Sequence, residues 1–188
     1  MICLDKSQLR NKTILYLKSL SNEEKKSTES KLTDQLIHSN IWKNATSIGI
    51  TISQGFEWDT REIIESAWRQ GKQVSVPKCE PVTKALRFYE FKTYDQLEVV
   101  YYNLKEPNPI KSKLMDKNQM DLLVVPGLIF DKNKFRIGFG GGYYDRFLTD
   151  FSHTTVSLLS REQLVDKIPK ETFDLPIDYL ISENEIYK

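Results

Sequence analysis

A strand, a helix and a second strand follow one another within about thirty residues, and this succession limits the folds open to the chain. The run Ile48-Gly49-Ile50-Thr51-Ile52 is short and β-branched, as in a buried strand. A helix is predicted from Asp59 to Arg69, ending at Gly71. Val74 to Val76 is predicted as the next strand, stopped by Pro77. Such a βαβ unit pairs its strands in parallel, so an α/β fold is predicted.

The remaining sequence continues this alternation of helices and strands. Two helices are predicted before residue 40, with apolar positions Leu4, Leu9, Tyr16, Leu17 and Leu20 in the first and Leu32, Leu36 and Ile37 in the second. Ser21 and Glu24 form a capping box at the start of the second helix. Further strands are predicted at Leu86–Phe91, Asp121–Pro126, Thr154–Leu159 and Tyr179–Ile181, and a loop at Glu106–Pro109. We therefore predict one three-layer, Rossmann-like domain over residues 1–188, with a mostly parallel sheet flanked by helices.

Composition excludes several classes of function. The 27 basic and 26 acidic residues leave a net charge of +1, which gives no field for non-specific binding to nucleic acid. The sequence has only two cysteines, Cys3 and Cys79, and two histidines, His38 and His153. These are too few and too scattered to favour a zinc site or a Ser-His-Asp triad. The sequence has no apolar run long enough to cross a membrane and turns polar directly after Met1, so we expect no signal peptide and a cytoplasmic protein.

Four of the eight glycines lie together at positions 138, 140, 141 and 142, after a strand-like run and before a predicted helix. Glycine lets main-chain N–H groups converge on an anion, and the helix that follows directs its positive end to the same place. Arg136 supplies a forked donor for phosphate oxygens, and Asp145 a carboxylate for the magnesium that accompanies a nucleotide. The cluster is neither a Rossmann fingerprint, because Tyr143 stands at the third glycine position, nor a Walker A loop. From the residues alone, a flexible turn between a hairpin and a helix is equally compatible.

Two strings around this cluster resemble a known family. Val125-Pro126-Gly127-Leu128-Ile129-Phe130-Asp131 and Arg136-Ile137-Gly138-Phe139-Gly140-Gly141-Gly142-Tyr143-Tyr144-Asp145-Arg146 closely resemble the signature of 5-formyltetrahydrofolate cyclo-ligases. Weaker matches lie elsewhere in the chain, and their order and separations agree with the family: Lys6 and Arg10, Glu57-Trp58-Asp59-Thr60, Glu106-Pro107 and Asp174. The sequence departs from the family at Lys134, where many relatives have a hairpin glycine, at Phe139, which replaces a common tyrosine, and at Phe173.

The resemblance implies an ATP-dependent cyclisation of 5-formyltetrahydrofolate to 5,10-methenyltetrahydrofolate, with release of ADP and phosphate through an iminium phosphate. It implies catalytic roles for Arg136, Tyr143 and Tyr144. ATP would be bound by Lys6, Arg10, Arg136, Ile137, Gly138, Phe139, Gly140, Gly141, Gly142, Tyr143 and Tyr144. The folate would be bound by Ile52, Glu57, Phe139 and Tyr143, and Mg²⁺ by Asp145 and Asp174. The implied partners are small molecules, with no nucleic acid or membrane, and the implied state is a monomer or weak dimer.

Most of these residues also have an ordinary structural explanation. Lys6 and Arg10 share one face of a helix, which is otherwise typical of a solvated surface. Glu57 suits the first turn of a helix, Asp174 suits a loop, and Ile52, Phe139 and Tyr144 suit a core. Two other functions also stay open from the residues alone: a folate or nucleotide binding protein without turnover, and a different α/β enzyme, such as a sugar-phosphate isomerase.

Overall fold

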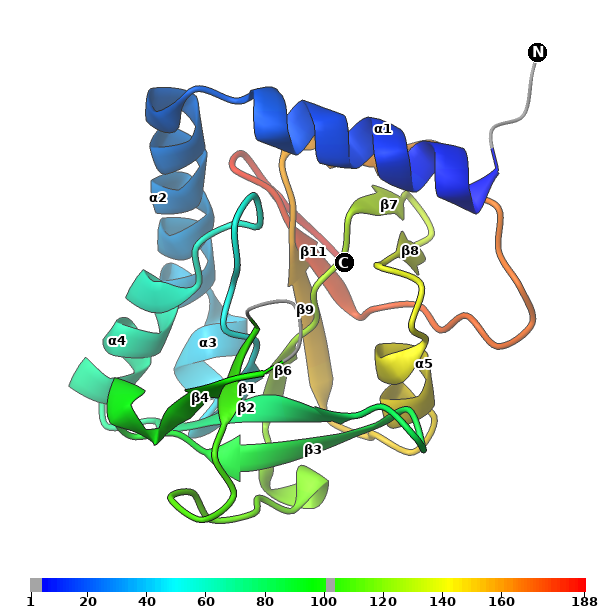
Figure 1. Cartoon of the computed structure of the whole chain (residues 1–188). Helices are drawn as coiled ribbons and strands as arrows, with labels where there is room; N and C mark the ends of the chain where they lie inside the picture. The colour runs from blue at the N-terminus through cyan, green and yellow to red at the C-terminus, as the bar shows by residue number, and fades with distance from the viewer. Residues whose placement is uncertain (1–4, 101–103) are drawn as a thin grey trace.

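The computed structural model describes residues 5–100 and 104–188, so Cys3 and Leu4 lie outside it (Figure 1). Its main sheet has seven strands in the spatial order β12 (Ile186–Tyr187), β11 (Tyr179–Ile181), β9 (Thr154–Leu158), β6 (Leu122–Val124), β1 (Ser47–Ile50), β2 (Gln73–Glu80) and β3 (Ala85–Glu90). The five central strands are parallel to their neighbours, and the two edge strands are antiparallel. This confirms the predicted α/β fold and the parallel pairing of the βαβ unit.

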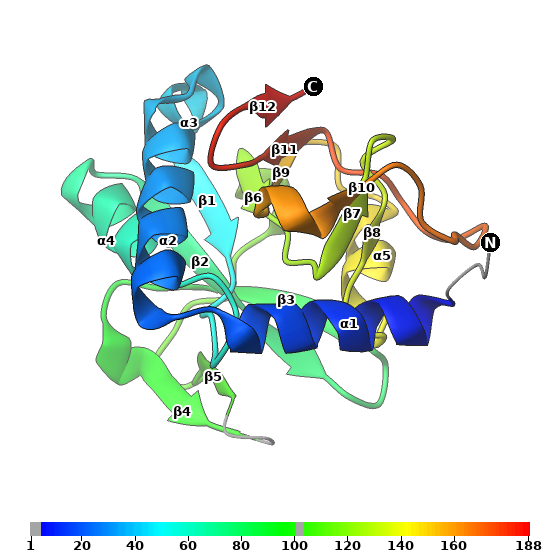
Figure 2. The same cartoon turned by 90° about the horizontal axis from the view of Figure 1, so that it is seen from above.

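Helices cover both faces of the sheet, and the first two of them start where the sequence provides a capping box. The helices α2 (Asn22–His38), α3 (Asn40–Asn44) and α4 (Arg61–Arg69) lie on one face, while α5 (Tyr143–Leu148) lies on the other and α1 (Lys6–Ser19) crosses beyond the strand ends (Figures 1 and 2). Both halves of the Ser21–Glu24 capping box are present at the start of α2. An equivalent box, Asp5 with Gln8, begins α1.

The alternation of side chains along each strand divides the core into two layers. Ile48 and Ile50 pack with the helices α2 to α4, whereas Gly49 faces Leu123 and Met120 in the second layer with α5. A Cβ on Gly49 would come within 2.8 Å of side-chain atoms of both neighbours, so a larger residue here would displace the Leu123 and Met120 side chains. The predicted three layers are therefore confirmed, with the sheet between two sets of apolar contacts.

Several small elements were not predicted. A second sheet has the order β10 (Leu164–Val165), β7 (Ile129–Asp131) and β8 (Arg136–Ile137), and a ribbon pairs β4 (Leu97–Val99) with β5 (Lys105–Pro107). Among the described residues, 3₁₀ turns span Tyr94–Gln96, Lys117–Gln119 and Arg161–Gln163. In the β7–β8 hairpin, Lys134 has a φ of 67°, so it holds a left-handed conformation that glycine adopts more readily.

Two predictions based on proline were wrong. Strand β2 runs through Pro77, because β1 pairs with it only as far as Ser75 and the lost N–H costs no bond to β1. Glu106 and Pro107 lie in a strand, not in a loop. Pro107 is tolerated there because it is the last residue of a short strand in a two-stranded ribbon.

None of the helices in the described ranges has the length and apolar character that crossing a bilayer requires. The thiol of Cys79 is free and half-buried. Burial, followed by the nearby carboxylate of Glu106, raises the pKa of Cys79 to about 12, so the sulfur is a poor nucleophile at neutral pH.

Candidate active site

The glycine cluster forms a tight loop between β8 and α5. Gly140 and Gly142 have φ values of 96° and 67°, a conformation that side chains with a Cβ rarely adopt. A Cβ on Gly140 would lie 3.3 Å from the Arg10 guanidinium, and one on Gly141 would lie 2.6 Å from the Tyr143 ring. The loop is therefore packed closely between Arg10 and Tyr143.

Two arginines hold the carbonyl groups of this loop. Arg10 on α1 donates from Nε to the carbonyl of Gly138 at 2.8 Å. Arg146 on α5 donates from Nη1 to the carbonyls of Gly141 and Gly142 at 3.2 and 3.0 Å. Within the described ranges, the amides of residues 139 to 141 donate to no acceptor. Unused amides beside an arginine are suited to bind an anion.

Arg136 lies beneath the loop and is only 7% exposed. Its Nη1 donates to the carbonyl of Leu175 at 3.1 Å and forms an ion pair with Oδ1 of Asp145 at 3.2 Å. Burial lowers the pKa of Arg136, and the charge of Asp145 opposes that effect. Arg136, predicted as a donor to phosphate, thus uses Nη1 for contacts within the protein. These contacts join β8 to α5 and to the segment around Leu175.

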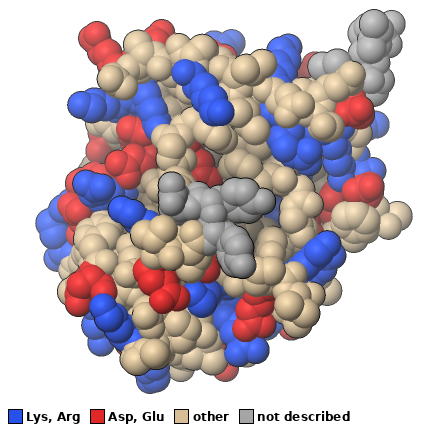
Figure 3. All heavy atoms as spheres, viewed as in Figure 1, with Lys and Arg blue, Asp and Glu red and all other residues tan. Residues whose placement is uncertain are grey.

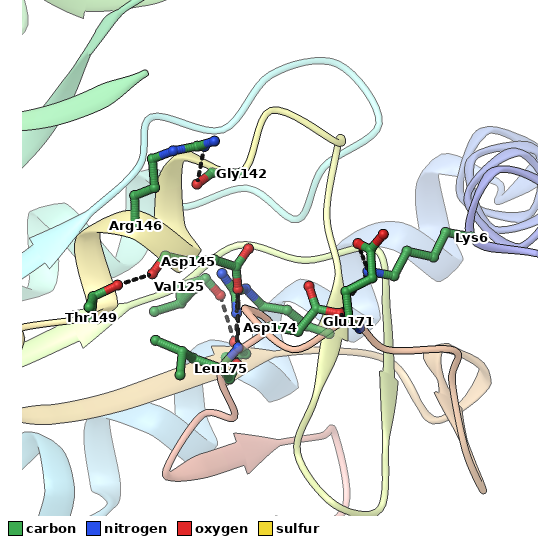
Figure 4. Close-up of polar contacts among 11 residues, drawn as sticks. Lys6, Val125, Gly142, Asp145, Arg146, Thr149, Glu171, Asp174 and Leu175 are labelled. Carbon is green, nitrogen blue, oxygen red and sulfur yellow. Dashed lines mark hydrogen bonds and ion pairs between the residues drawn. The ribbon is translucent and has the colours of Figure 1, made fainter. Parts of the chain in front are cut away.

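Lys6 reaches from α1 toward the same segment (Figure 4). Its Nζ lies 2.7 Å from Oδ2 of Asp174 and 2.8 Å from Oε2 of Glu171. Partial burial lowers the pKa of Lys6, but hydrogen bonds to Asp174 and Glu171 outweigh this, and the net pKa is raised. Lysine and arginine side chains gather at this end of α1, on the right of Figure 3. Lys6 and Arg10 therefore both face the candidate site.

The two predicted magnesium ligands lie near one guanidinium. Asp145 and Asp174 both oppose the lowering of the pKa of Arg136. The protein contacts of Asp145 use Oδ1, and those of Asp174 use Oδ2, so each carboxylate keeps one oxygen that makes no contact with described residues. Carboxylate oxygens are ligands that Mg²⁺ accepts. The described residues contain no cluster of three or more such side chains, so a metal here would also need ligands from a nucleotide.

Glu57 lies in the loop that follows β1. Its carboxylate accepts a hydrogen bond from the amide of Gln54 at 2.6 Å, and burial raises its pKa despite that bond and the nearby charge of Lys25. A hollow of about 240 Å³ is lined by Glu57 together with Lys25 and Arg61. Ile52, at the start of the same loop, is half-buried against the core.

Tyr144 directs a buried hydroxyl toward the same part of the molecule. Burial strongly raises its pKa; Cys79 and Glu57 add to the rise, and the charge of Arg136 opposes it. Thr51 lies near enough to oppose that rise, but the contact lacks hydrogen-bond geometry, and the hydroxyl has no partner within the described residues. An unpartnered buried hydroxyl is unusual and indicates a group that a ligand can satisfy.

The other predicted residues are placed as follows. Tyr143 packs against the second core layer, beside Gly141. The side chain of Ile137 is buried with Ile129, away from the loop surface. Phe139 is 52% exposed, and its ring centroid lies 6.2 Å from that of Phe56. Phe139 is therefore not a core residue.

Comparison with known proteins identifies the family to which this arrangement belongs. Residues 3–183 match the model of the 5-formyltetrahydrofolate cyclo-ligase family. The chain belongs to this family. The predicted family membership is thereby confirmed, and with it the prediction of a ligase.

Relatives of the family cover most of this chain. The 5-formyltetrahydrofolate cyclo-ligase of Escherichia coli K12 is 29% identical over 148 residues, which are 77% of this chain and 81% of the relative. The mouse 5-formyltetrahydrofolate cyclo-ligase is 27% identical over 190 residues, 95% and 94% of the two chains. The solved structure of the Aquifex aeolicus 5,10-methenyltetrahydrofolate synthetase has a TM-score of 0.85 at 26% identity, covering 97% of this chain and 92% of its own.

Some residues that shape the site were missed from the sequence. Arg146 was quoted within the motif but given no role, although its spacing of four residues from Gly142 places it over the loop carbonyls. Glu171 shares Lys6 with Asp174, and only its place three residues before Asp174 could have indicated this. No sequence signal marks the carbonyl of Leu175 as the acceptor for Arg136.

Proposed function

We propose that the protein is a 5-formyltetrahydrofolate cyclo-ligase that uses ATP to form 5,10-methenyltetrahydrofolate. The formyl oxygen on N5 attacks the γ-phosphorus of ATP, and ADP leaves. The resulting iminium phosphate is electrophilic at carbon. N10 attacks that carbon and loses its proton, and inorganic phosphate departs as the ring closes. Phosphoryl transfer depends on alignment and charge stabilisation rather than on a protein nucleophile.

The observation that carries this proposal is the glycine loop with unused amides, held between Arg10 and Arg146 beside the Arg136–Asp145 pair. The amides and Arg10 bind the phosphates, with Lys6 close to the same end of α1. Arg136 acts from beneath the loop by fixing Asp145 and by lending positive charge. Tyr143 and Tyr144 orient the formyl oxygen and the transferred phosphoryl group.

Mg²⁺ fits the chemistry of the two free carboxylate oxygens at this site. Asp145 and Asp174 would hold the ion together with oxygens of ATP, and its charge would offset that of the triphosphate. Because Asp174 accepts from Lys6, this lysine must share or release the carboxylate when the ion arrives. The ammonium of Lys6 is then available to a phosphate.

The folate is assigned to the loop after β1. Its pterin 2-amino and N3–H groups are donors that match the carboxylate of Glu57. Ile52, Phe139 and Tyr143 provide apolar contact to the pterin or to its aryl substituent. We further propose that residues 1–188 act as one domain, as a monomer or weak dimer in the cytoplasm.

One assay tests the function directly. Purified protein is mixed with 5-formyltetrahydrofolate and Mg·ATP, and the methenyl absorbance is followed while ADP is measured. We expect equal amounts of the two products. Binding of either substrate without turnover would contradict the proposed reaction, and so would turnover without ATP.

A further inference from the structure

Phe56 and Phe139 join the two sides of the candidate site. Phe139 belongs to the glycine loop and Phe56 to the loop after β1, next to Glu57, and their rings are tilted by 43°. Phe56 rests on the apolar cluster beneath α1, which includes Leu17 and Trp58. The pair therefore has one anchored ring and one ring that is 52% exposed. An exposed aromatic ring beside an anchored one offers a flat ligand a surface for stacking.

A lysine from the last turn of α1 lies beside this pair. The Nζ of Lys18 is 5.4 Å from the centroid of the Phe56 ring. Lys18 is exposed and forms no ion pair with any residue that the structure describes. The neighbouring cations of the site differ, since Lys6 and Lys25 are each paired with carboxylates. Lys18 is thus a free cation at the edge of an aromatic surface.

The proposed substrate carries an aromatic ring followed by carboxylates, which matches the order of the aromatic pair and Lys18 in the protein. The aryl ring of a reduced folate is attached to N10, the atom that attacks the formyl carbon. During the reaction the ring must therefore lie beside the phosphoryl group, and hence beside the glycine loop that contains Phe139. The glutamate is joined to the far side of this ring, so its carboxylates leave the site past the ring.

We propose that Phe56, with Phe139, stacks on the aryl ring of the folate and that Lys18 binds its glutamate carboxylates. This inference rests on the proposed function and extends it to the half of the substrate that does not react. It assigns the pterin to Glu57 and the aryl-glutamate half to the Phe56–Lys18 subsite. Neither residue of this subsite belongs to the glycine motif.

The experiment compares 5-formyltetrahydrofolate with 5-formyltetrahydropteroate, which lacks the glutamate. Lys18→Ala is expected to raise KM for the glutamate-bearing substrate about fivefold and to leave KM for the pteroate and for ATP unchanged. Lys12→Ala is the matched control, because Lys12 is exposed on α1 six residues away and therefore on another face. Phe56→Leu should raise KM for both folates about fivefold, and Phe56→Tyr, which keeps the ring, should restore it.

The outcomes are distinct. If the unaltered protein shows no ATP-dependent turnover, the proposed function fails and this inference with it. If it turns over but Lys18→Ala affects both folates equally or behaves as Lys12→Ala, the carboxylate subsite is overturned. If Phe56→Leu keeps the thermal midpoint of the unaltered protein and also its KM values, the stacking role is overturned. If Phe56→Leu unfolds, Phe139→Leu gives the decision, because it removes the exposed ring of the same pair: KM for both folates must rise with an intact midpoint, and unchanged KM values overturn the stacking role.

Discussion

The nucleotide side and the folate side of the candidate site satisfy their polar groups in opposite ways. On the nucleotide side, Lys6 pairs with Asp174, Arg136 pairs with Asp145 and Arg10 holds a loop carbonyl. On the folate side, the half-buried carboxylate of Glu57 forms no ion pair with the described residues and has a raised pKa, and the hydroxyl of Tyr144 has no partner among them. The charged side chains of the nucleotide side are therefore paired with one another, whereas the folate side keeps a carboxylate without a cation and a hydroxyl without a hydrogen bond.

This difference indicates how each substrate gains its binding energy. Internal ion pairs keep opposite charges together without a ligand, so ATP and its metal must exchange partners with groups already placed in position. An unsatisfied buried donor or acceptor costs about 1 to 3 kcal/mol, which a ligand that supplies the missing bond recovers. Substitutions on the nucleotide side should therefore affect both stability and turnover, and those on the folate side mainly substrate affinity.

Arg136→Ala should give the largest effect. Removal of the guanidinium leaves Asp145 without its cation and the carbonyl of Leu175 without its donor. We expect turnover to fall at least tenfold and stability by about 2 kcal/mol, less than for a fully buried pair because Asp145 is partly exposed. Steady-state kinetics and chemical denaturation measure the two. Arg87→Ala, at an exposed ion pair with Glu80, is the control, and equal effects of both substitutions would contradict a special role for Arg136.

Asp145→Asn should give the next largest effect. The amide keeps the shape of the side chain but loses the charge that Mg²⁺ and Arg136 require. We expect the magnesium concentration for half-maximal turnover to rise about tenfold, because the loss of one contact to a charged group costs at least about 1.5 kcal/mol. Asp150→Asn, at the exposed pair with Lys117 just beyond α5, is the control. An unchanged magnesium titration for Asp145→Asn would exclude this ligand.

The sequence allowed the main sheet and the glycine loop to be predicted because both depend on local patterns. The continuous apolar run at Leu122–Val124 indicates a strand buried on both faces, and the βαβ unit indicates parallel pairing. The glycine cluster indicated a backbone that can adopt positive φ, and Gly140 and Gly142 do so. The path through Pro77 was mispredicted because a proline is tolerated wherever the neighbouring strand has already ended, which is a property of the sheet.

The detailed contacts of the site could not be predicted, because they join distant segments. Lys6 and Asp174 are 168 residues apart, and the pairing of Arg136 with a carbonyl leaves no mark on residue types. The burial of a side chain could not be predicted either. From the sequence, Glu57 is typical of an acidic residue in the first turn of a helix, and its pKa is raised only by burial in the folded chain. The family resemblance located these residues but not the contrast between paired and unpaired groups.

Glu57→Gln examines the folate side through its charge. The raised pKa means that Glu57 takes up a proton at a higher pH than an ordinary glutamate, whose pKa is about 4.3. Folate affinity should therefore weaken as the pH falls toward that range from neutral. Glu57→Gln should raise KM for folate about tenfold, leave KM for ATP unchanged and remove this pH dependence. The measurement is KM for folate and for ATP between neutral and mildly acid pH. Equal changes in the two KM values would contradict the assignment of Glu57 to the pterin.

Tyr144→Phe should have the smallest effect and separates the two sides most clearly. The substitution removes only the hydroxyl that has no partner, so the free enzyme should be as stable as the unaltered protein or slightly more stable. Turnover and folate affinity should fall about fivefold, because a neutral hydrogen bond to the ligand contributes about 1 kcal/mol. Thermal unfolding without and with 5-formyltetrahydrofolate measures both, and the gain in midpoint on folate addition should shrink. A loss of stability in the free enzyme would mean that the hydroxyl is satisfied within the protein, and the contrast between the two sides would then disappear.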